Sequence, residues 1–443
     1  MILKYQPKDW DIATDATPDQ VLKLFPRGGL VGASFGVVNI PLDPGSMLVN
    51  SGLNPDHVEV ATFRKDGDYT DGRRPDTVEF TTSVEEDSNR RDFTFNALFY
   101  DPFKTWNVNP DYPGLLDFHG GLKDLKKGIV RCVGMPYNRF REDYLRMLRA
   151  IRFAVRFNFW LDIPVMESLE VHARKIYDVA PERVQGELNG MMATGRFHRA
   201  LALLDSLGLL KWIIPELGAL KGCEQPPEFH PEGDVWTHTM LAMEYLMDGK
   251  LAADVVTNLG LLFHDLGKPG TIGYDGKRIT FHGHEQFGGV MARVVMRNLR
   301  YPNEITADVV WIIENHMRFY RLPEMRIGKA RQFMAHRLFD RLMEVCRCDC
   351  ASSQQDFSST AEWIAEKRRQ YSVESTRNTV PLVNGDVLIR IGMKPGPTFK
   401  TILEEALNAQ LEGRFTTQDE GIRFVLDFNE GYNKGMLTKV IEP

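Results

Sequence analysis

Close to its first residue the chain carries Lys8-Asp9-Trp10-Asp11-Ile12-Ala13-Thr14, and the two aspartates of this stretch are the first indication of the fold. Asp9 and Asp11 are separated by one position, so in an extended strand both carboxylates point to the same face. Such a pair can share two divalent metal ions, the arrangement that phosphoryl transfer uses, and hard oxygen ligands suit Mg²⁺. Alone the pattern is weak, because exposed carboxylates are common on protein surfaces.

The residues that follow this pair predict an α/β region. Apolar segments of strand length recur at 35–40, 58–63 and 78–81. The segment 17–25 reads as a helix between strands, with Thr17 as its N-cap and Pro18 in its first turn. After about residue 130, helical spacing takes over in the segments 140–153, 164–175, 183–192, 198–210 and 237–247. We therefore expect an α/β head followed by a helical body.

Length and composition limit the class of protein. At roughly 100–200 residues per domain, 443 residues predict about two to four domains. No apolar run reaches about 18 residues, so we expect no membrane-spanning helix. The first residues lack a signal-peptide pattern, so we expect a cytoplasmic protein. Five cysteines are too few for a disulfide scaffold, and Cys346, Cys348 and Cys350 are expected as small residues in or near a helix.

Two kinds of side chain are clustered along the chain. The net charge of −6 excludes a uniformly basic nucleic-acid binder, but six arginines face only two acidic residues between Arg139 and Arg156. Within this segment, a stripe at helical spacing suits a triphosphate or an RNA backbone: Arg146, Arg149, Arg152 and Arg156. Seven of the eleven histidines lie between His230 and His336, which indicates a metal or acid–base site in the middle of the chain.

Further motifs follow the aspartate pair in a fixed order. They are Val58-Glu59-Val60-Ala61-Thr62-Phe63-Arg64, Asp71-Gly72-Arg73-Arg74-Pro75, Arg90-Arg91-Asp92-Phe93-Thr94-Phe95-Asn96-Ala97, Glu142-Asp143-Tyr144-Leu145-Arg146, and the segment from Glu182-Arg183 to Glu187-Leu188. With the aspartate pair, this series resembles the signature of class II tRNA nucleotidyltransferases, the CCA-adding enzymes and bacterial poly(A) polymerases. The resemblance extends over nearly the whole chain.

The resemblance implies a role for each motif. Asp9 and Asp11 would hold Mg²⁺ and act with Glu59 as the catalytic carboxylates. Contacts with the nucleotide are expected from Arg91, Asp92, Asn96, Asp143, Arg146, Arg149 and Arg152. Asp143 and Arg146 are three positions apart, which predicts that they are neighbours on one helix face, where the pair would read a base edge. By spacing alone, a surface ion pair explains them as well.

The central histidines form a second ordered set: His238, His264-Asp265, His284, His316 and Asp349. This order resembles the HD phosphohydrolase superfamily. An adjacent His-Asp pair can bind a divalent metal and leave positions open for water and phosphate, and His284 with His316 would permit a second metal. The metal would be a divalent transition metal or Mg²⁺. A helical scaffold that carries the histidines without a metal stays open as the alternative.

The expected fold is α+β, with four parts in chain order. A polymerase-β-like nucleotidyltransferase head spans 1–127, a helical neck for nucleotide selection and RNA binding 128–215, an HD domain 216–370, and a helical tail for tRNA binding 371–443. The family places a Gly-Gly-x-Val-Arg-Asp turn before the paired aspartates, and no such turn precedes Asp9. We therefore expect the head to lack its first strand and this turn, with Met1 as an internal start.

The expected activity is addition of CCA, or part of it, to the 3′ end of tRNA from CTP and ATP, with HD phosphohydrolase activity beside it. A poly(A) polymerase shares these motifs, but only CCA or CC addition consumes CTP. A metal-dependent phosphohydrolase with a disabled head would release phosphate without extending RNA. A non-catalytic RNA-binding protein would bind tRNA with steep salt dependence and show neither reaction. The sequence leaves the oligomeric state open.

Overall fold

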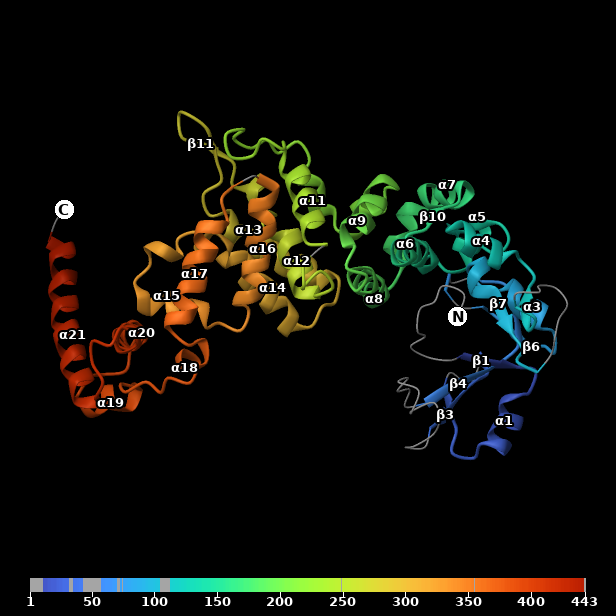
Figure 1. Ribbon diagram of the computed structural model, residues 1–443, viewed down its shortest axis with the longest axis horizontal. Helices are drawn as coiled ribbons and strands as arrows, with labels where there is room; N and C mark the ends of the chain where they lie inside the picture. The colour runs from blue at the N-terminus through green and yellow to red at the C-terminus, as the bar shows by residue number, and fades with distance from the viewer. Residues whose placement is uncertain are drawn as a thin grey trace. The chain divides into compact units, whose positions relative to one another are not determined.

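The computed structural model describes residues 11–31, 35–42, 57–69, 72–73, 75–103, 112–247, 249–353 and 355–441, without the side chains of 431–441. The chain divides into two compact units (Figure 1). The first consists of Met1–Gly218 with Asn298–Arg300, and the second of Ala219–Arg297 with Tyr301–Pro443. The expected division into four parts stays a prediction.

The first unit begins with a four-stranded sheet in the order β1-β4-β3-β2. Its strands are β1 (Asp11–Thr14), β2 (Gly29–Val31), β3 (Val37–Pro41) and β4 (His57–Thr62). Strand β1 runs parallel to β4, whereas β3 is antiparallel to both of its neighbours. Helix α1 (Pro18–Leu24) contacts β3 and β4, and four valines form the core between them: Val21, Val38, Val58 and Val60. The predicted strands at 35–40 and 58–63 are confirmed.

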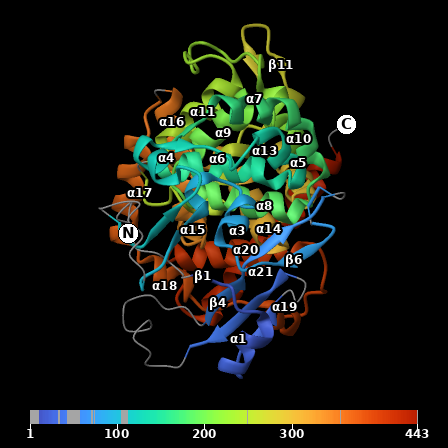
Figure 2. The same cartoon turned by 90° about the vertical axis from the view of Figure 1, so that its right-hand side faces the viewer.

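Helix α1 begins where the sequence predicts. The backbone N–H of Thr17 donates to Oε1 of Gln20 over 2.8 Å, and the side chain of Thr17 accepts from the backbone N–H of Gln20. Pro18 is the first helical residue, where its missing N–H costs nothing. This reciprocal capping box orients the chain as it leaves β1. Figure 2, turned by 90° from Figure 1, again shows α1 beside the sheet.

Short strands and helices connect this sheet to the rest of the unit. They are β5 (Arg64–Asp66), β6 (Val78–Phe80), α3 (Val84–Asn89), the 3-10 helix η2 (Thr94–Ala97), β7 (Leu98–Tyr100), β8 (Leu115–Asp117), α4 (Gly121–Lys127) and β9 (Ile129–Val130). Strands β5 and β6 pair antiparallel, as do β7 and β8. The predicted strand at 78–81 is therefore present as β6.

A helical region completes the first unit. Its elements are α5 (Pro136–Glu142), α6 (Leu145–Phe157), β10 (Trp160–Leu161), α7 (Ile163–His172), η3 (Ala173–Asp178), α8 (Pro181–Met192), α9 (Phe197–Ser206), α10 (Leu210–Ile213) and η4 (Pro215–Leu220). Strand β10 pairs in parallel with β9. Helix α6 packs against α8 and α9, and it buries Met147, Leu148 and Ile151 completely.

The continuous helix expected over 140–153 is wrong, because the chain breaks between α5 and α6. Asp143 adopts an extended backbone, with φ −152° and ψ 106°. Its side chain then accepts a hydrogen bond from the backbone N–H of Leu145 over 3.0 Å. An aspartate that satisfies a free N–H at a helix start favours such a break. Asp143 and Arg146 therefore do not share one helix face.

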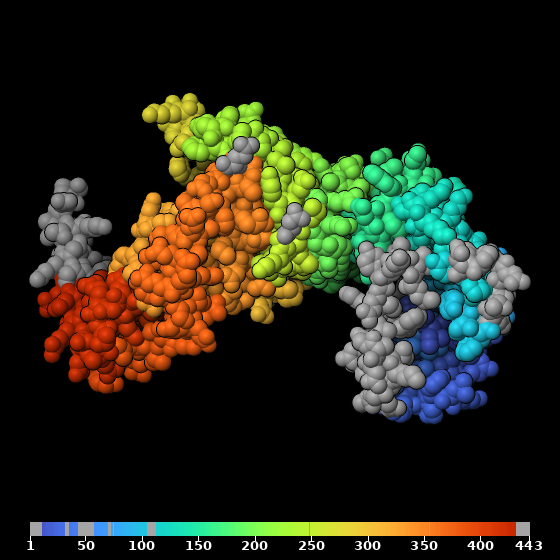
Figure 3. All heavy atoms as spheres, viewed as in Figure 1, coloured from blue at the N-terminus to red at the C-terminus, as the bar shows by residue number. Residues whose placement is uncertain are grey.

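The second unit contains most of the histidines. Its elements are α11 (Val235–Tyr245), α12 (Val255–Phe263), η5 (Lys268–Gly270), β11 (Gly273–Tyr274), β12 (Ile279–Thr280), α13 (His284–Asn298), α14 (Asn303–Phe319), η6 (Leu322–Glu324), α15 (Ile327–Met334) and α16 (Phe339–Ser353). Helix α16 packs against α11, α12 and α14. The hairpin β11–β12 projects from these helices (Figure 3). Cys346, Cys348 and Cys350 are buried and unbridged on α16, as expected.

The last helices form a core of their own. They are α17 (Ser358–Gln370), α18 (Val373–Arg377), α19 (Gly385–Arg390), α20 (Thr398–Leu411) and α21 (Gln418–Ile441). Val387, Leu388, Ile402 and Val425 belong to the buried cluster of this region. Helix α15 contacts α20, and the mixed α+β fold with a helical body is confirmed. Among the described helices, none combines the length and apolar character that crossing a membrane requires.

Candidate active site and candidate metal centre

Asp11 and Glu59 lie side by side on the sheet of the first unit. The parallel pairing of β1 with β4 places Asp11 directly opposite Glu59. Both residues are solvent-exposed, and half of the Glu59 side chain is accessible. Asp9, the other member of the predicted carboxylate pair, lies outside the described residues. The sheet register therefore brings two of the three predicted carboxylates together.

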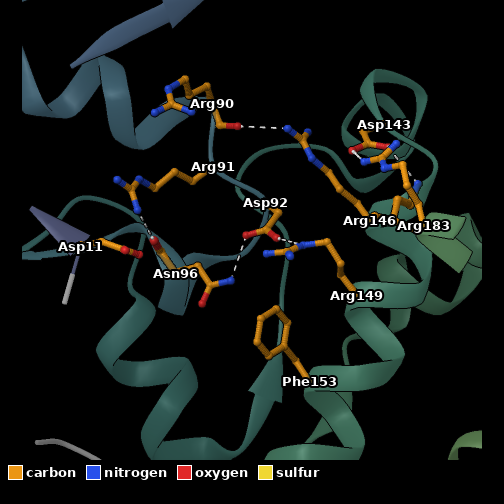
Figure 4. Close-up of a pocket in the computed structure, with 11 residues that line it drawn as sticks. Asp11, Arg90, Arg91, Asp92, Asn96, Asp143, Arg146, Arg149, Phe153 and Arg183 are labelled. Atoms are coloured by element: carbon orange, nitrogen blue, oxygen red, sulfur yellow. Dashed lines mark hydrogen bonds and ion pairs between the residues drawn. The ribbon is translucent and has the colours of Figure 1, made fainter. Parts of the chain in front are cut away.

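Beside Asp11 lies a cavity of about 550 Å³, here called the arginine cavity (Figure 4). It is lined by Asp11, Arg90, Arg91, Asp92, Asn96, Asp143, Leu145, Arg146, Arg149, Phe153 and Arg183. Five arginines face three aspartates, so the cavity attracts an anion. Of the predicted nucleotide-binding residues, all except Arg152 line it. Motifs far apart in the chain therefore converge on one cavity.

Asp92 is the buried acidic residue of this cavity. Its carboxylate accepts from Nε of Arg149 over 2.7 Å and from Nδ2 of Asn96 over 3.0 Å. Burial opposes ionisation, but the charge of Arg149 and the hydrogen bonds from Asn96 and Arg149 outweigh it and lower the pKa of Asp92. The ionised carboxylate thus orients two other residues of the cavity.

Arg91 is held by a residue that the sequence analysis did not identify. Its guanidinium donates to Oδ2 of Asp87 over 3.1 Å and to the backbone carbonyl of Asn96 over 3.1 Å. Asp87 is fully buried on α3 and also accepts from Arg90 over 2.7 Å. One buried carboxylate therefore anchors two arginines of the cavity. The spacings of three and four positions from Asp87 would have predicted both contacts.

Asp143 and Arg146 contact separate partners in the cavity. Asp143 pairs with Arg183 of α8, with Nη2 of Arg183 2.7 Å from Oδ2 (Figure 4). Arg146 pairs with Glu142 and donates to the backbone carbonyl of Arg139 over 3.1 Å. The predicted pair on one helix face is wrong, yet both side chains line the same cavity. Arg183 belongs to the motif that begins at Glu182, but no residue pattern predicted its place in this cavity.

Arg152 is not among the residues that line the cavity. Its Nε donates to Glu187 of α8 over 2.6 Å, and both side chains are mostly buried. The guanidinium also lies 4.5 Å from the ring centroid of Phe153, within cation–π distance. In this position Arg152 joins α6 to α8. Its role in nucleotide binding stays a prediction that no contact of the described residues supports.

The predicted histidine–aspartate set converges in the second unit, as two ligand groups. The first ligand group is His238, His264 and Asp349, and the second is Asp265, His284 and His316; within each group the ligand atoms lie within 4.8 Å of one another. Asp265 joins them: its Oδ2 is 3.2 Å from Nε2 of His264, and its Oδ1 is 3.4 Å from Nε2 of His284. Four histidine nitrogens and two carboxylates match the donors that a divalent metal takes.

The outer nitrogens of these histidines are already occupied. Nδ1 donates to the backbone carbonyl three positions earlier in His264, His284 and His316, over 2.7, 2.8 and 2.7 Å. In His238 it lies 2.6 Å from Oε1 of Glu232. Each ring therefore presents Nε2 to the centre, the tautomer that metal ligation requires.

The charges of the site are unevenly distributed. Burial opposes the charge on His238, but hydrogen bonds with Asp349 and Glu232 raise its pKa to about 9. Burial, with repulsion from His264 and His284, lowers the pKa of His316 to about 3. Glu232 and Asp349 therefore favour a charged imidazole at His238, whereas the imidazole of His316 is neutral.

Two families match parts of the chain. The Poly A polymerase head domain family matches residues 1–131, and the family described as "Probable RNA and SrmB- binding site of polymerase A" matches residues 158–220. The CC-adding tRNA nucleotidyltransferase of Thermus thermophilus is 31% identical over 369 residues, which are 80% of each chain. The CCA-adding enzyme of Geobacillus thermodenitrificans is 38% identical over 205 residues, and that match spans only 46% of either chain.

Solved structures share the fold over almost the whole chain. The CCA-adding enzyme of Bacillus stearothermophilus in complex with CTP has a TM-score of 0.68 and 24% identity, and the match covers 98% of this chain and 92% of that one. The Thermotoga maritima CCA-adding enzyme complexed with tRNA has a TM-score of 0.55 and 18% identity, covering 96% and 88%. At these identities the likeness shows the fold alone.

Proposed function

The chain belongs to the family of class II CCA-adding tRNA nucleotidyltransferases, and on this premise we propose that it extends the 3′ end of tRNA with nucleotides from CTP and ATP. The observation that carries the proposal is the arginine cavity beside Asp11 and Glu59. Five guanidinium groups provide the charge and the forked donors that a triphosphate needs. The reaction is attack of the tRNA 3′-hydroxyl on the α-phosphate, with pyrophosphate as the leaving group.

Asp11 and Glu59, with Asp9 from outside the described residues, would hold Mg²⁺ in the head. Asp11 and Glu59 are exposed and opposite each other on adjacent strands, so their side chains lie on the same face of the sheet, and oxygen is the ligand that this cation prefers. When bound, Mg²⁺ acidifies the 3′-hydroxyl and neutralises the charge on the pyrophosphate. The arginines of the cavity would orient the triphosphate toward this edge of the sheet.

The residues of the cavity divide the remaining tasks. Asp92 keeps acceptor capacity beyond its bonds to Arg149 and Asn96, which suits a ribose hydroxyl. Asp143 offers acceptors and Arg146 offers donors, the complement that a base edge requires. Arg183 orients the Asp143 side chain, and Glu142 orients the Arg146 side chain. Asp143 and Arg146 can therefore both contact a base without forming an ion pair with each other. Choice of nucleotide would then depend on Arg183 and Glu142 as well.

Primer extension tests the proposal and separates its variants. The chain would be incubated with tRNA that lacks its end, or that ends in C or CC, and with CTP, ATP or both. Incorporation of CTP on the first two tRNAs is expected, followed by one ATP if the enzyme completes CCA. Addition that stops at CC would show a CC-adding activity, like that named for the Thermus relative. Long tracts from ATP alone, without use of CTP, would show a poly(A) polymerase and overturn the proposal.

The histidine–aspartate centre supports a second activity, metal-dependent phosphohydrolysis. The favouring observation is the convergence of four Nε2 atoms and two carboxylates on one buried point. The two ligand groups would hold divalent metals, which activate water and polarise a phosphate when bound. Release of phosphate from 2′- or 3′-phosphorylated nucleotides, dependent on added metal, tests it. Absence of hydrolysis with Mg²⁺, Mn²⁺, Ni²⁺ and Co²⁺ would leave the helices as a scaffold only.

A further inference from the structure

Glu232 contacts the metal centre from a loop that the motif does not include. It lies two residues before Asp234, the N-cap of α11, and its side chain is only 6% exposed. One oxygen, Oε1, is 2.6 Å from Nδ1 of His238 and 2.9 Å from Nδ1 of His230. On the other side of the His238 ring, Nε2 is 3.1 Å from Oδ1 of Asp349. The imidazole is therefore held between Glu232 and the ligand centre.

This contact distinguishes His238 from the other histidines of the centre. In His264, His284 and His316 the orienting acceptor is a backbone carbonyl of the segment that carries the histidine. Such an acceptor is present whenever the segment folds, and no substitution removes it. Nδ1 of His238 instead meets two side chains from other segments, Oε1 of Glu232 at 2.6 Å and Oγ of Ser352 at 3.1 Å. The shorter of these contacts, and the only one to a carboxylate, comes from the loop that carries Glu232.

That loop is fastened at several points. The backbone N–H of Val235 donates to the carbonyl of Cys223 over 3.0 Å, and the N–H of Gly222 donates to the Asp234 side chain over 2.7 Å. Gln225 accepts from Nζ of Lys268 over 2.7 Å, and the same ammonium group lies 2.7 Å from Oδ2 of Asp265. The loop is thus tied to its own helix and to the ligand centre.

Tyr320 orients a second ligand of the same group. Its hydroxyl donates to Oδ2 of Asp349 over 2.6 Å, which leaves Oδ1 facing His238. Two of the three residues in the first ligand group therefore depend on side chains outside the motif. The histidines of the second group depend on backbone carbonyls.

We propose that Glu232 and Tyr320 are positioning residues that orient the ligands of the first group. The metal position of the first group then depends on these two side chains, whereas that of the second group does not. The inference rests on the proposed metal centre. Removal of Glu232 takes away the nearer and charged acceptor of His238 Nδ1 and leaves the Ser352 hydroxyl, 3.1 Å away, as its remaining partner. Loss of such an outer partner typically weakens metal binding about 10–100-fold. The second ligand group should keep its metal.

Binding of Mn²⁺ to the full chain tests this inference. Calorimetric titration should show two tight ions in the parent chain, and electron paramagnetic resonance should show them magnetically coupled. In Glu232→Ala one ion should weaken about 10–100-fold, and the spectrum should change to that of isolated Mn²⁺. Tyr320→Phe, which removes only the hydroxyl, should change in the same direction. Glu232→Gln keeps an acceptor oxygen and should restore part of the affinity.

Glu285→Ala is the matched control. Glu285 lies 3.7 Å from Nδ1 of His284, but that nitrogen already donates to the carbonyl of Phe281. Its removal should leave both ions in place, and an unchanged helical circular dichroism spectrum in each variant verifies that the helices of this unit are folded. Two coupled, tight ions in Glu232→Ala would overturn the role of Glu232. Absence of Mn²⁺ binding by the parent chain would instead overturn the metal centre, and this inference with it.

Discussion

Asp143 and Arg183 form an ion pair, with Nη2 and Nη1 of Arg183 2.7 and 3.2 Å from the two carboxylate oxygens, although 40 positions separate them in the chain. The pair joins the break between α5 and α6 to the first turn of α8, at the wall of the arginine cavity. It determines where the Asp143 carboxylate points. Any reading of a base by Asp143 therefore starts from a side chain that Arg183 has already oriented.

The first prediction follows from this contact. Arg183→Ala should weaken the preference for CTP and ATP over UTP and GTP, as Asp143→Ala and Arg146→Ala should. Loss of one base-edge contact costs roughly 1–3 kcal/mol of discrimination. Competition between paired nucleotides in single-turnover extension measures it. Arg199→Ala removes an arginine of the same unit that does not line the cavity, and its selectivity should stay unchanged. Unaltered selectivity in Arg183→Ala would show that the ion pair is only structural.

Asp11 and Glu59 are expected to be needed for the reaction and dispensable for RNA binding. Asp11→Ala should lower extension roughly 10²-fold or more, the scale on which loss of one electrostatic contribution to a transition state acts. Glu59→Gln should lower it less, because the amide keeps an oxygen ligand. Affinity for tRNA, measured by filter binding, should change little. Full extension by Asp11→Ala would contradict the assignment of the carboxylates.

Asp92 gives a prediction about pH. Because its pKa is lowered in the folded chain, its ionised form contributes stability above the unfolded pKa of about 3.9, and this contribution is lost as pH falls toward the folded pKa. Asp92→Asn should be less stable than the parent at pH 7 by about 2 kcal/mol, the scale of hydrogen bonds to charged groups. The difference should shrink as denaturation is repeated between about pH 5 and pH 3. A constant difference over that range would show that the charge of Asp92 contributes nothing.

Arg152 should act on stability and not on the nucleotide. Its ion pair with Glu187 is mostly buried, and removing one partner of such a pair costs roughly 3–5 kcal/mol at full burial. Arg152→Ala should therefore lower the denaturant midpoint while KM for CTP stays within about twofold. Arg156→Ala, one turn further along α6, is the comparison, because Arg156 is exposed. A large rise in KM for CTP with an unchanged denaturant midpoint would show that Arg152 binds the nucleotide after all.

The histidine–aspartate centre should be separable from the head. The double change His264→Ala with Asp265→Ala should abolish metal-dependent hydrolysis of phosphorylated nucleotides, because it removes a ligand from each group. Extension of tRNA should stay within about twofold, since the arginine cavity belongs to the other unit. Parallel loss of both activities would indicate that these helices act as a scaffold.

The amino-acid sequence by itself determined the features that depend on nearby residues. The start of helix α1 at Thr17 and Pro18, the strands β3 and β4, and the order of the histidine motif were all readable from spacing and residue type. Hydrogen bonds between residues three or four positions apart follow from helix geometry, and strand alternation follows from the pleat. Such patterns need no knowledge of distant parts of the chain.

Only the tertiary structure decided which distant residues meet. The pairing of Asp11 with Glu59 is set by the register of β1 on β4, and a slip of one residue would turn the side chains to the other face. Arg183 and Glu232 reach their partners because helix and loop packing carries them there. The break at Asp143 also escaped the sequence pattern, because apolar residues keep helical spacing on both sides of it. Burial makes these contacts strong, and burial is a property of the folded chain.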